Sequence, residues 1–580
     1  MHYKKTIVVT LLLGGLLSTL VGCNTSSNIG GDVVYPDYPL TPGDKDSWEY
    51  LKDENGNVEP WEFEWYVNDS TFSWNSYGSD RVSQIIKEKT GVTIKFTAPV
   101  TDDGQKLSTL ISGNKLPDVI SVQCWYNQCH QLADQGYLYP LDGLIERWAP
   151  SFVEKEQKDI WRYFSEKDGY TYGVPNFAYS TQYVNDTDKM EPNGCLLVRK
   201  DWYQEASNAG YDMTSPSSFI AGCEYIKAQH SDAIPFQLAP FTSEGNASLD
   251  WLSQYFCSAY EDSAGNYQDT RLTARYQEMM EFLNTCTKKG LILSANFSDK
   301  AEQIKTKIAR GNVFVSAVTP QDYQMAFINC YSNKKIEYVP LVLKNKDGQA
   351  PILQDISGNG YLLTMVTRNC KRPDKVIKVL EYLYSEEGQR LVAFGIEGES
   401  YNWNADHTAV EWTDRYVAGI NGDAAAQAWI NELGLYQMTL LMNLAYINKI
   451  KPLNGRRDTD IYIDNLKRPM TPYSYNFKPT FLKHDTSKEN YFNIATKYDK
   501  IKTKWAEYTV NVLRGNNWKT EYDNAIKYLK RIGLDEVNEF YATSYQETKQ
   551  LLGVEWGYPM NKPGYTEPVT GPNGDPSYYR

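Results

Sequence analysis

The sequence lacks several features on which common classes of enzyme and binding protein depend. Histidine is scarce, with 5 residues in 580, and no pair stands at a metal-binding spacing. There is no Gly-x-Ser-x-Gly nucleophile motif and no phosphate-binding loop. Basic residues are in deficit, because 59 Lys and Arg face 72 Asp and Glu, for a net charge of −13. These absences argue against metalloproteases, serine hydrolases, nucleotide-dependent enzymes and nucleic-acid binding.

Apolar runs long enough to span a bilayer are also missing. The one strongly apolar stretch, Thr6–Leu20, is short and follows Lys4 and Lys5. A charged start, an apolar core and small residues before a cut are typical of a secretory signal. The stretch ends at Leu20-Val21-Gly22-Cys23, which resembles the bacterial lipobox, whose peptide is removed before a cysteine that carries diacylglycerol. We therefore expect a signal peptide at 1–22 and lipidation at Cys23; an ordinary secretory signal with a chance cysteine is the alternative.

The segment after Cys23 is rich in Gly, Pro, Asp and Tyr, so we expect a flexible, lipidated spacer at 23–47. The net negative charge disfavours docking to anionic lipid through a basic patch, so the lipid itself must hold the membrane. The predicted location is extracytoplasmic, at the outer face of the cell membrane.

Nine cysteines are present, and the eight besides Cys23 are spread through the chain without a disulfide framework. Cys124 and Cys129 form the one close pair; a metal site there lacks a second ligand pair. Buried free thiols are favoured, and a Cys124–Cys129 disulfide stays open. The stretch Asp53–Glu59 faintly resembles a calcium loop, but Val58 stands where that loop needs glycine, so we interpret it as a turn. No metal or cofactor is predicted.

Aromatic residues are abundant, with 45 Tyr, 15 Trp and 19 Phe. Much of this surplus must form core. Tyr and Trp also suit a wet cleft, because each has an apolar face and a polar edge. Sugar rings present matching C–H faces and hydroxyls, so a carbohydrate ligand is the interpretation that these residues favour.

Strand and helix patterns alternate along the chain. We expect strands at 61–68, 92–96 and 116–122, with helices at 80–90 and 104–111 between them. Such an order predicts a parallel sheet with crossover helices, and so an α/β fold. Further strands are expected at 195–199 and 313–318, and long helices at 373–393 and 518–534.

Short segments in a fixed order resemble extracellular solute-binding proteins of family 1, the sugar-binding lipoproteins of bacterial ABC importers. The resemblance covers nearly the whole chain after the signal. The segments that carry it are Gly113–Ile120, Tyr172–Pro175, Leu197–Trp202, Asn369–Gln389, Gly395–Gly398 and Tyr528–Asp535.

The resemblance implies a two-lobed periplasmic-binding-protein-like fold of type II, with a ligand cleft and a hinge between the lobes. The N-terminal lobe would take 48–182 and 336–400, and the C-terminal lobe 183–335 and 401–580. Longer members often carry a calcium loop before an Ile-Pro pair; here the place reads Gln229–Pro235 without the ligand-rich residues, so calcium is not expected. The implied partners are an oligosaccharide and the transmembrane permease subunits, with the protein acting as a monomer.

Candidate ligand contacts are aromatic and amide residues on loops that follow strands, where the fold places a cleft. For each tryptophan, packing in the core is about as good an interpretation as ligand contact. For Asn359, a tight turn between glycines is the alternative. The candidates are Trp74, Asn75, Tyr77, Trp125, Tyr126, Trp251, Asn359 and Trp403.

A surface-anchored glycoside hydrolase is the alternative function. It needs two carboxylates across a cleft. Glu62 with Glu64, and Glu397 with Glu399, are the nearest pairs, and neither stands in a catalytic motif. The sequence therefore predicts a non-catalytic, lipid-anchored receptor that closes around an oligosaccharide and delivers it to an ABC permease.

Overall fold

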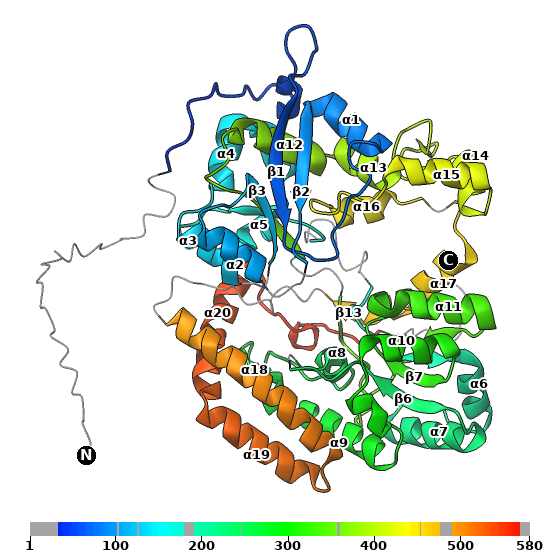
Figure 1. Ribbon diagram of the computed structural model, residues 1–580. Helices are drawn as coiled ribbons and strands as arrows, with labels where there is room; N and C mark the ends of the chain where they lie inside the picture. The colour runs from blue at the N-terminus through cyan, green and yellow to red at the C-terminus, as the bar shows by residue number, and fades with distance from the viewer. Residues whose placement is uncertain are drawn as a thin grey trace, which may run out of the picture.

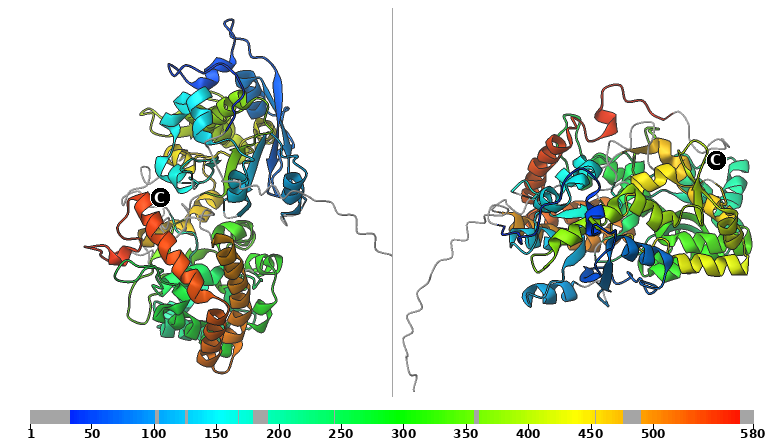
Figure 2. Two further views of the ribbon diagram at one scale, coloured as in Figure 1. Left: turned by 90° about the vertical axis from the view of Figure 1, so that its left-hand side faces the viewer. Right: turned by 90° about the horizontal axis from the view of Figure 1, so that it is seen from above.

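The structure is a computed structural model that describes residues 33–100, 104–124, 127–166, 168–178, 191–243, 245–355, 360–452, 454–475 and 490–568. Two α/β lobes lie one above the other, each with its own sheet and apolar core (Figures 1 and 2). The predicted two-lobed α/β fold is confirmed.

The first lobe is built on a five-stranded sheet. Its order is β2 (Val92–Thr97), β1 (Trp61–Val67), β3 (Val119–Gln123), β10 (Leu362–Val366) and β4 (Gly173–Pro175). The first three strands are parallel, as predicted, whereas β10 is antiparallel to both of its neighbours, so the sheet is mixed. Trp65, Tyr66 and Val67 are all buried because helices cover both faces where β1 ends.

Two helices of the first lobe, α1 (Arg81–Thr90) and α13 (Glu386–Phe394), begin at residues whose side chains cap them. Asp80 caps the first of them by accepting a hydrogen bond from the Ser83 N–H, and Gly91 ends it at φ 71°. Further helices of this lobe are α2 (Gln105–Ser112), α3 (Asn127–Asp134), α4 (Leu141–Trp148), α5 (Lys158–Tyr163) and α12 (Pro373–Tyr384).

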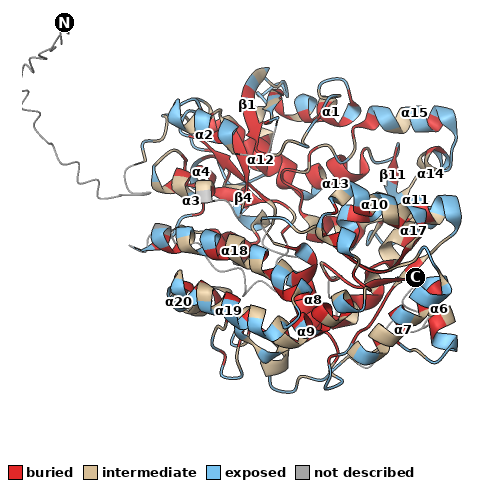
Figure 3. Ribbon diagram, turned by 60° about the horizontal axis from the view of Figure 1, so that its bottom comes forward, coloured by how far each residue is buried: buried red, intermediate tan, exposed pale blue. Residues whose placement is uncertain are grey.

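The long helix predicted at 373–393 is two helices. Ser385 adopts an extended conformation between α12 and α13, and its side chain caps α13 by accepting a hydrogen bond from the Gly388 N–H. A Cβ at Gly388 would stand 2.1 Å from the Tyr382 carbonyl oxygen, so the close turn requires glycine there. Figure 3 shows α12 buried along its length.

The second lobe has a four-stranded sheet in the order β6 (Ile234–Leu238), β7 (Val313–Ala317), β5 (Leu197–Arg199) and β8 (Tyr338–Pro340). β6 and β7 are parallel, and β5 is antiparallel to β7 and β8. Its helices are α6 (Lys200–Asn208), α7 (Pro216–Gln229), α8 (Ala247–Tyr255), α9 (Ala274–Lys288), α10 (Ala301–Arg310), α11 (Gln324–Lys334), α18 (Tyr491–Arg514), α19 (Trp518–Arg531) and α20 (Leu534–Leu552).

Two segments pack with a different lobe from the one expected. Residues 338–353 were expected in the first lobe, but β8 pairs with β5, and Leu341 and Leu353 lie in the second core. Residues 401–450 were expected in the second lobe. They lie with the first lobe, because Leu440 and Leu441 enter its core and α13 contacts α16. This group comprises β11 (Tyr401–Trp403), β12 (Val410–Trp412), α14 (Asp414–Ile420), α15 (Ala424–Leu433) and α16 (Leu444–Ile450) (Figure 1).

Among the described residues, the sequence switches between the two cores three times. At the second-lobe side the crossing segments touch: Pro192 bridges to Asp355, and the Asn193 N–H donates to the Gln354 carbonyl at 2.7 Å. β9 (Leu353–Gln354) also pairs with β13 (Ser474–Tyr475), beyond α17 (Asp458–Asn465). The crossing segments therefore form one connected strip.

The segment before η1 (Ser47–Leu51) corrects the expected spacer. Residues 33–47 pack on the first lobe instead of standing free. Tyr35 stacks on Tyr139 with ring centroids 5.6 Å apart, the Thr41 N–H donates to the Arg147 carbonyl, and Asp46 pairs with Lys155 at 2.7 Å. Aromatic contacts give this Pro-rich segment enough buried surface to stay ordered. The rest of the expected spacer, 23–32, lies outside the described residues.

The cysteines in the described part of the chain are free thiols. The Cys129 Sγ contacts the Gln123 carbonyl and the Cys124 Sγ contacts the Gly360 carbonyl, so the pair is not bridged. Burial raises the pKa of Cys124 to about 12, which keeps it a thiol. Within the described residues, every helix is too short or too polar to cross a membrane.

Candidate functional site

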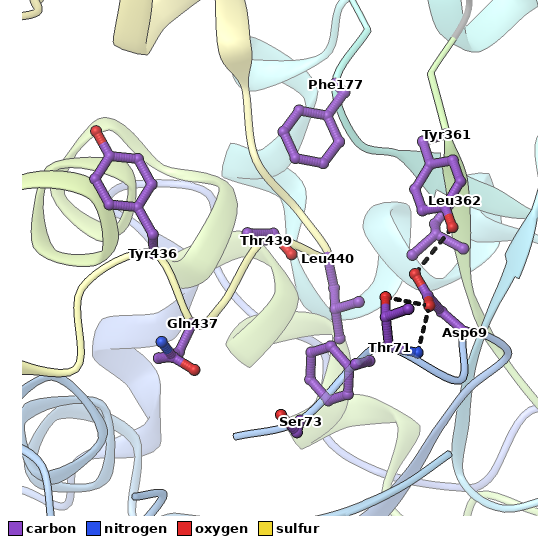
Figure 4. A pocket seen from close by; sticks show the side chains of 11 residues that line it. Asp69, Thr71, Ser73, Phe177, Tyr361, Leu362, Tyr436, Gln437, Thr439 and Leu440 are labelled. Carbon is purple, nitrogen blue, oxygen red and sulfur yellow. Dashed lines mark hydrogen bonds between the residues drawn. The ribbon is translucent and has the colours of Figure 1, made fainter. Parts of the chain in front are cut away.

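A pocket of about 210 Å³ lies where β1 ends and β10 begins, at the edge of the first lobe from which the chain leaves for the second (Figures 1 and 4). Typical small-molecule sites measure about 300–1,000 Å³, so this pocket holds only part of an oligosaccharide. It is lined by Asp69, Thr71, Phe72, Ser73, Phe177, Tyr361, Leu362, Tyr436, Gln437, Thr439 and Leu440.

Asp69 is the one carboxylate among the lining residues. One of its oxygens accepts hydrogen bonds from the backbone N–H and the hydroxyl of Thr71, at 2.8 and 2.6 Å. The other accepts from the Tyr361 hydroxyl at 2.9 Å, and Figure 4 shows these contacts as dashed lines. The loop after β1 is thereby joined to the residue before β10. The oxygen that accepts from Tyr361 keeps a lone pair for a ligand hydroxyl, whereas the other is occupied by its two bonds from Thr71.

Asn176 holds two walls of the pocket in place. Its side chain is fully buried; the oxygen accepts from the Leu362 N–H at 2.6 Å, and the amide N–H donates to the Thr439 carbonyl at 2.9 Å. The next residue, Phe177, stands at φ 51°, an uncommon conformation for a bulky side chain. This backbone turn brings the Phe177 ring to the pocket (Figure 4).

Aromatic rings supply most of the apolar lining. Phe72, Phe177 and Tyr361 are half-buried, while Tyr436 is 47% exposed. Figure 4 shows Tyr436 and Tyr361 at opposite ends of the pocket, with Phe177 between them. Rings that flank a carboxylate, a threonine and a glutamine can hold a flat polyhydroxylated molecule, by stacking on its C–H faces and bonding its hydroxyls.

The predicted contacts around Trp74 are near this region, but none of them lines the pocket. Trp74 is only 7% exposed; it packs in the first core, and its indole N–H donates to Asp80 at 2.7 Å. Tyr77 is half-buried, and its hydroxyl accepts from the Ile94 N–H at 2.9 Å. Asn75 is exposed. The structure therefore gives Trp74 a packing role, and Asn75 and Tyr77 stay predictions as ligand contacts.

The remaining candidates are scattered. Trp251 is buried in the second core at 3% exposure, which agrees with the packing alternative. Trp403 is half-buried beside the Arg390 guanidinium, 5.5 Å from the ring centroid. Trp125, Tyr126 and Asn359 lie outside the described residues and stay predictions.

Within the described ranges, no group of three or more His, Cys, Asp or Glu side chains could hold a metal ion. The Asp53 side chain stabilises the turn that follows it. One of its carboxylate oxygens accepts hydrogen bonds from the backbone N–H groups of Asn55 and Asn57, at 2.9 and 2.8 Å. That oxygen is occupied as in an Asx turn, which agrees with the turn interpretation.

Sequence reasoning missed Asp69, Tyr361, Phe177 and Tyr436. Asp69 had a usable signal, because it comes two residues after β1, at the carboxyl end of a parallel strand. Tyr361 precedes β10 by one residue and had a weaker signal. Nothing local marked Phe177 or Tyr436, which reach the pocket through contacts between segments far apart in the sequence.

The chain folds into two α/β lobes joined by crossing segments, and a polar, aromatic pocket lies at the edge where the segments cross. This arrangement is that of a hinged solute-binding protein. The sequence comparison agrees: residues 82–397, more than half of the chain, match the family described as bacterial extracellular solute-binding protein. The chain belongs to this family, and the predicted resemblance is confirmed.

Among curated proteins, the chain is similar to the fructooligosaccharide ABC transporter substrate-binding protein FusA of Streptococcus pneumoniae. The two are 23% identical over 515 residues, which cover 81% of this chain and 87% of FusA.

Solved structures share the fold. FusA in complex with kestose superposes with a TM-score of 0.63 at 17% identity, covering 84% of this chain and all of FusA. An extracellular solute-binding protein from Bifidobacterium longum subsp. infantis gives 0.63 at 14% identity, covering 86% and 99% of the two chains. The alginate-binding protein AlgQ2 gives 0.58 at 15% identity, covering 84% and 99%. At these identities the likeness establishes the fold alone.

Proposed function

We propose that the protein captures an oligosaccharide between its lobes and delivers it to the transmembrane subunits of an ABC importer. The observation that carries the proposal is the first-lobe pocket, in which the Asp69–Tyr361 pair lies among aromatic rings at the crossing edge. Carbohydrates present the C–H faces and hydroxyls that this lining suits. Similarity to a fructooligosaccharide-binding relative supports the same ligand class.

Capture proceeds by hinge closure without chemistry. A ligand bound to the first lobe bridges to the second, so it binds the closed form better and shifts the population toward it. A diacylglycerol on Cys23 holds the receptor at the outer face of the membrane, near its permease. Multiple acyl chains give the stable anchoring that repeated capture requires.

A hydrolase is the less favoured function, on an observation at the pocket itself. Glycoside hydrolysis needs two carboxyl groups about 5–9.5 Å apart across the scissile bond. Asp69 is the one acidic residue of the pocket lining. The pairs considered from the sequence lie elsewhere: Glu62 and Glu64 are exposed along β1, and Glu399 approaches Arg81 at 3.9 Å.

Calorimetric titration with an oligosaccharide panel tests the proposal. The panel includes kestose, nystose, maltotriose and an alginate trisaccharide, and each mixture is then analysed chromatographically for cleavage. We expect saturable 1:1 binding of at least one sugar, recovered intact. Tyr361→Phe should weaken that binding about three- to tenfold, because it removes one hydrogen-bonding hydroxyl from the pocket.

Tyr170→Phe is the matched control, since Tyr170 is an exposed tyrosine of the same lobe outside the pocket. Unchanged affinity in Tyr361→Phe would remove the pocket from the binding site. Release of shorter sugars would replace the receptor with the hydrolase.

A further inference from the structure

Helix α8 lies directly beside the crossing segments. It follows β6, whose carboxyl end shares an edge with that of parallel β7, and loops at such an edge form ligand crevices. The Gln354 N–H donates to the Gln254 side-chain oxygen at 2.7 Å, which ties α8 to one crossing segment. The Trp251 ring packs against Gly194 of another, where an added Cβ would stand 2.6 Å from the ring. α8 therefore occupies the hinge side of the second lobe.

Asp250 is the exposed polar residue of this helix, since Ser248, Ser253 and Gln254 are buried. Leu249, Trp251 and Leu252 are buried, whereas the Asp250 side chain is exposed (Figure 3 shows α8). Its carboxylate makes no hydrogen bond or ion pair with any residue in the described part of the chain. Asp232, another exposed carboxylate of the second lobe, does have a partner, since it accepts a hydrogen bond from the Asn312 side chain at 2.7 Å.

Asp250 lies close to residues of α9 and α18. Desolvation by the surrounding protein raises its pKa to about 6, and Lys502 and Arg271 offset this only in part. Tyr276 of α9 and Tyr498 of α18 also lie within electrostatic reach. The exposed Asp250 carboxylate therefore lies beside α9 and α18, where the neighbouring protein disfavours its charged form.

Three buried polar groups of the second lobe, on α8, β6 and β7, are unpartnered among the described residues. They are the Trp251 indole N–H, the Gln237 side-chain oxygen and the Ser316 hydroxyl. Gln237 and Ser316 are register partners near the carboxyl ends of β6 and β7. Each such group destabilises the folded protein when it is left unsatisfied. Such groups concentrate where water or a ligand completes the hydrogen bonding.

We propose that Asp250 is a ligand-binding residue of the second lobe, whose carboxylate accepts hydrogen bonds from sugar hydroxyls when the lobes close. The proposal deepens the function proposed above and rests on it. In this proposal Asp69 binds the ligand from the first lobe, and Asp250 binds it from the second lobe. A charge-assisted hydrogen bond formed only in the closed state holds the ligand in, so its loss raises the dissociation rate and leaves association nearly unchanged.

The test compares wild type, Asp250→Asn and Asp250→Ala by calorimetry and stopped-flow fluorescence with whichever of kestose, nystose, maltotriose and alginate trisaccharide the wild type binds. We expect about tenfold weaker affinity for Asp250→Asn and a larger loss for Asp250→Ala, both carried by faster dissociation. Glu281→Gln, an exposed carboxylate of α9, should bind like wild type.

The outcomes separate the two proposals. Equal affinity and equal dissociation rates in wild type and both Asp250 variants would overturn the role of Asp250 and leave the receptor function standing. A wild-type protein that binds no sugar of the panel would overturn both. Thermal unfolding of each variant confirms that a loss of affinity is not a loss of fold.

Discussion

The side-chain oxygen of Asn176 accepts a hydrogen bond from the backbone N–H of Leu362 at 2.6 Å. The same side chain donates to the Thr439 carbonyl. One buried amide thus joins the start of the first crossing to the ends of two segments that line the pocket. The shape of the pocket depends on a residue that is absent from its lining.

Asn176→Ala should lower both stability and affinity. It leaves the Leu362 N–H and the Thr439 carbonyl unsatisfied, at about 1–3 kcal/mol each. We expect a lower unfolding midpoint in urea and weaker sugar binding measured by calorimetry on the folded protein. Asn176→Asp keeps the acceptor but buries a carboxylate against the Thr439 carbonyl, so it should lower stability at least as much as the alanine variant. Asn511→Ala, on an exposed position of α18, is the control. Wild-type affinity in a folded Asn176→Ala would show that the amide does not position the pocket.

Trp74 should matter for stability and not for ligand contact. Truncation of a buried tryptophan to alanine costs about 3–5 kcal/mol, and Trp74→Ala also removes the donor to Asp80. Trp74→Phe keeps most of the packing. We expect chemical denaturation to show a large loss of unfolding free energy for Trp74→Ala and a smaller loss for Trp74→Phe. Trp74→Phe should bind sugar with wild-type affinity. A folded Trp74→Phe that no longer binds sugar would restore Trp74 to the ligand site.

Glu261 should anchor the C-terminal segment in a pH-dependent way. Burial opposes its ionisation, but hydrogen bonds from Tyr545, Asn561 and the backbone N–H groups of Gly557 and Tyr558 outweigh it, so its pKa is lowered. A lowered folded-state pKa stabilises the protein above the unfolded value of about 4.3, and the contribution is lost as pH falls through the folded pKa.

Glu261→Gln places an amide against these donors and should lower the melting temperature at pH 7. The difference from wild type should shrink as the pH falls from 5 toward 3.5, as followed by differential scanning calorimetry. Glu302→Gln, at an exposed site on α10, is the control. A constant difference across this range would contradict the pH linkage.

Asp250 should act in the opposite direction on stability. Its pKa is raised to about 6, mainly by desolvation. The folded protein then binds more protons than the unfolded chain between about pH 4 and 6, so stability falls as pH rises through this window. Asp250→Asn removes the ionisation. The melting temperature of Asp250→Asn should be slightly higher than that of wild type at pH 7.5. This difference in melting temperature should disappear by pH 4. A variant less stable than wild type at pH 7.5 would contradict the desolvated environment of Asp250.

Regular elements were predictable because their signals are local. The strands at β1, β2 and β3 and the helices at α1 and α2 follow periodic patterns with caps such as Asp80 and Gly91. The antiparallel β10 was not predictable, since its pairing depends on a return from the second lobe. The prediction that residues 401–450 belong to the second lobe was wrong for the same reason. Leu440 and Leu441 join the core of the first lobe through long-range packing, which leaves no local signal.

The site was less predictable than the fold. Aromatic residues were sought as ligand contacts, but Trp74 and Trp251 satisfy the core instead. Asp69, two residues past β1, had the clearer signal, because it follows the carboxyl end of a parallel strand. Aromatic rings do line the pocket, but they are Phe72, Phe177, Tyr361 and Tyr436, which residue type alone did not single out.

Small-angle X-ray scattering during titration with the panel sugar that binds tests the central claim most directly, because capture by lobe closure changes the shape of the whole molecule. The account predicts that the radius of gyration decreases saturably with the calorimetric affinity, and that Asp250→Ala needs more sugar to reach the same decrease. Saturable binding with no change in the radius of gyration of wild type would contradict closure of the two lobes around the ligand.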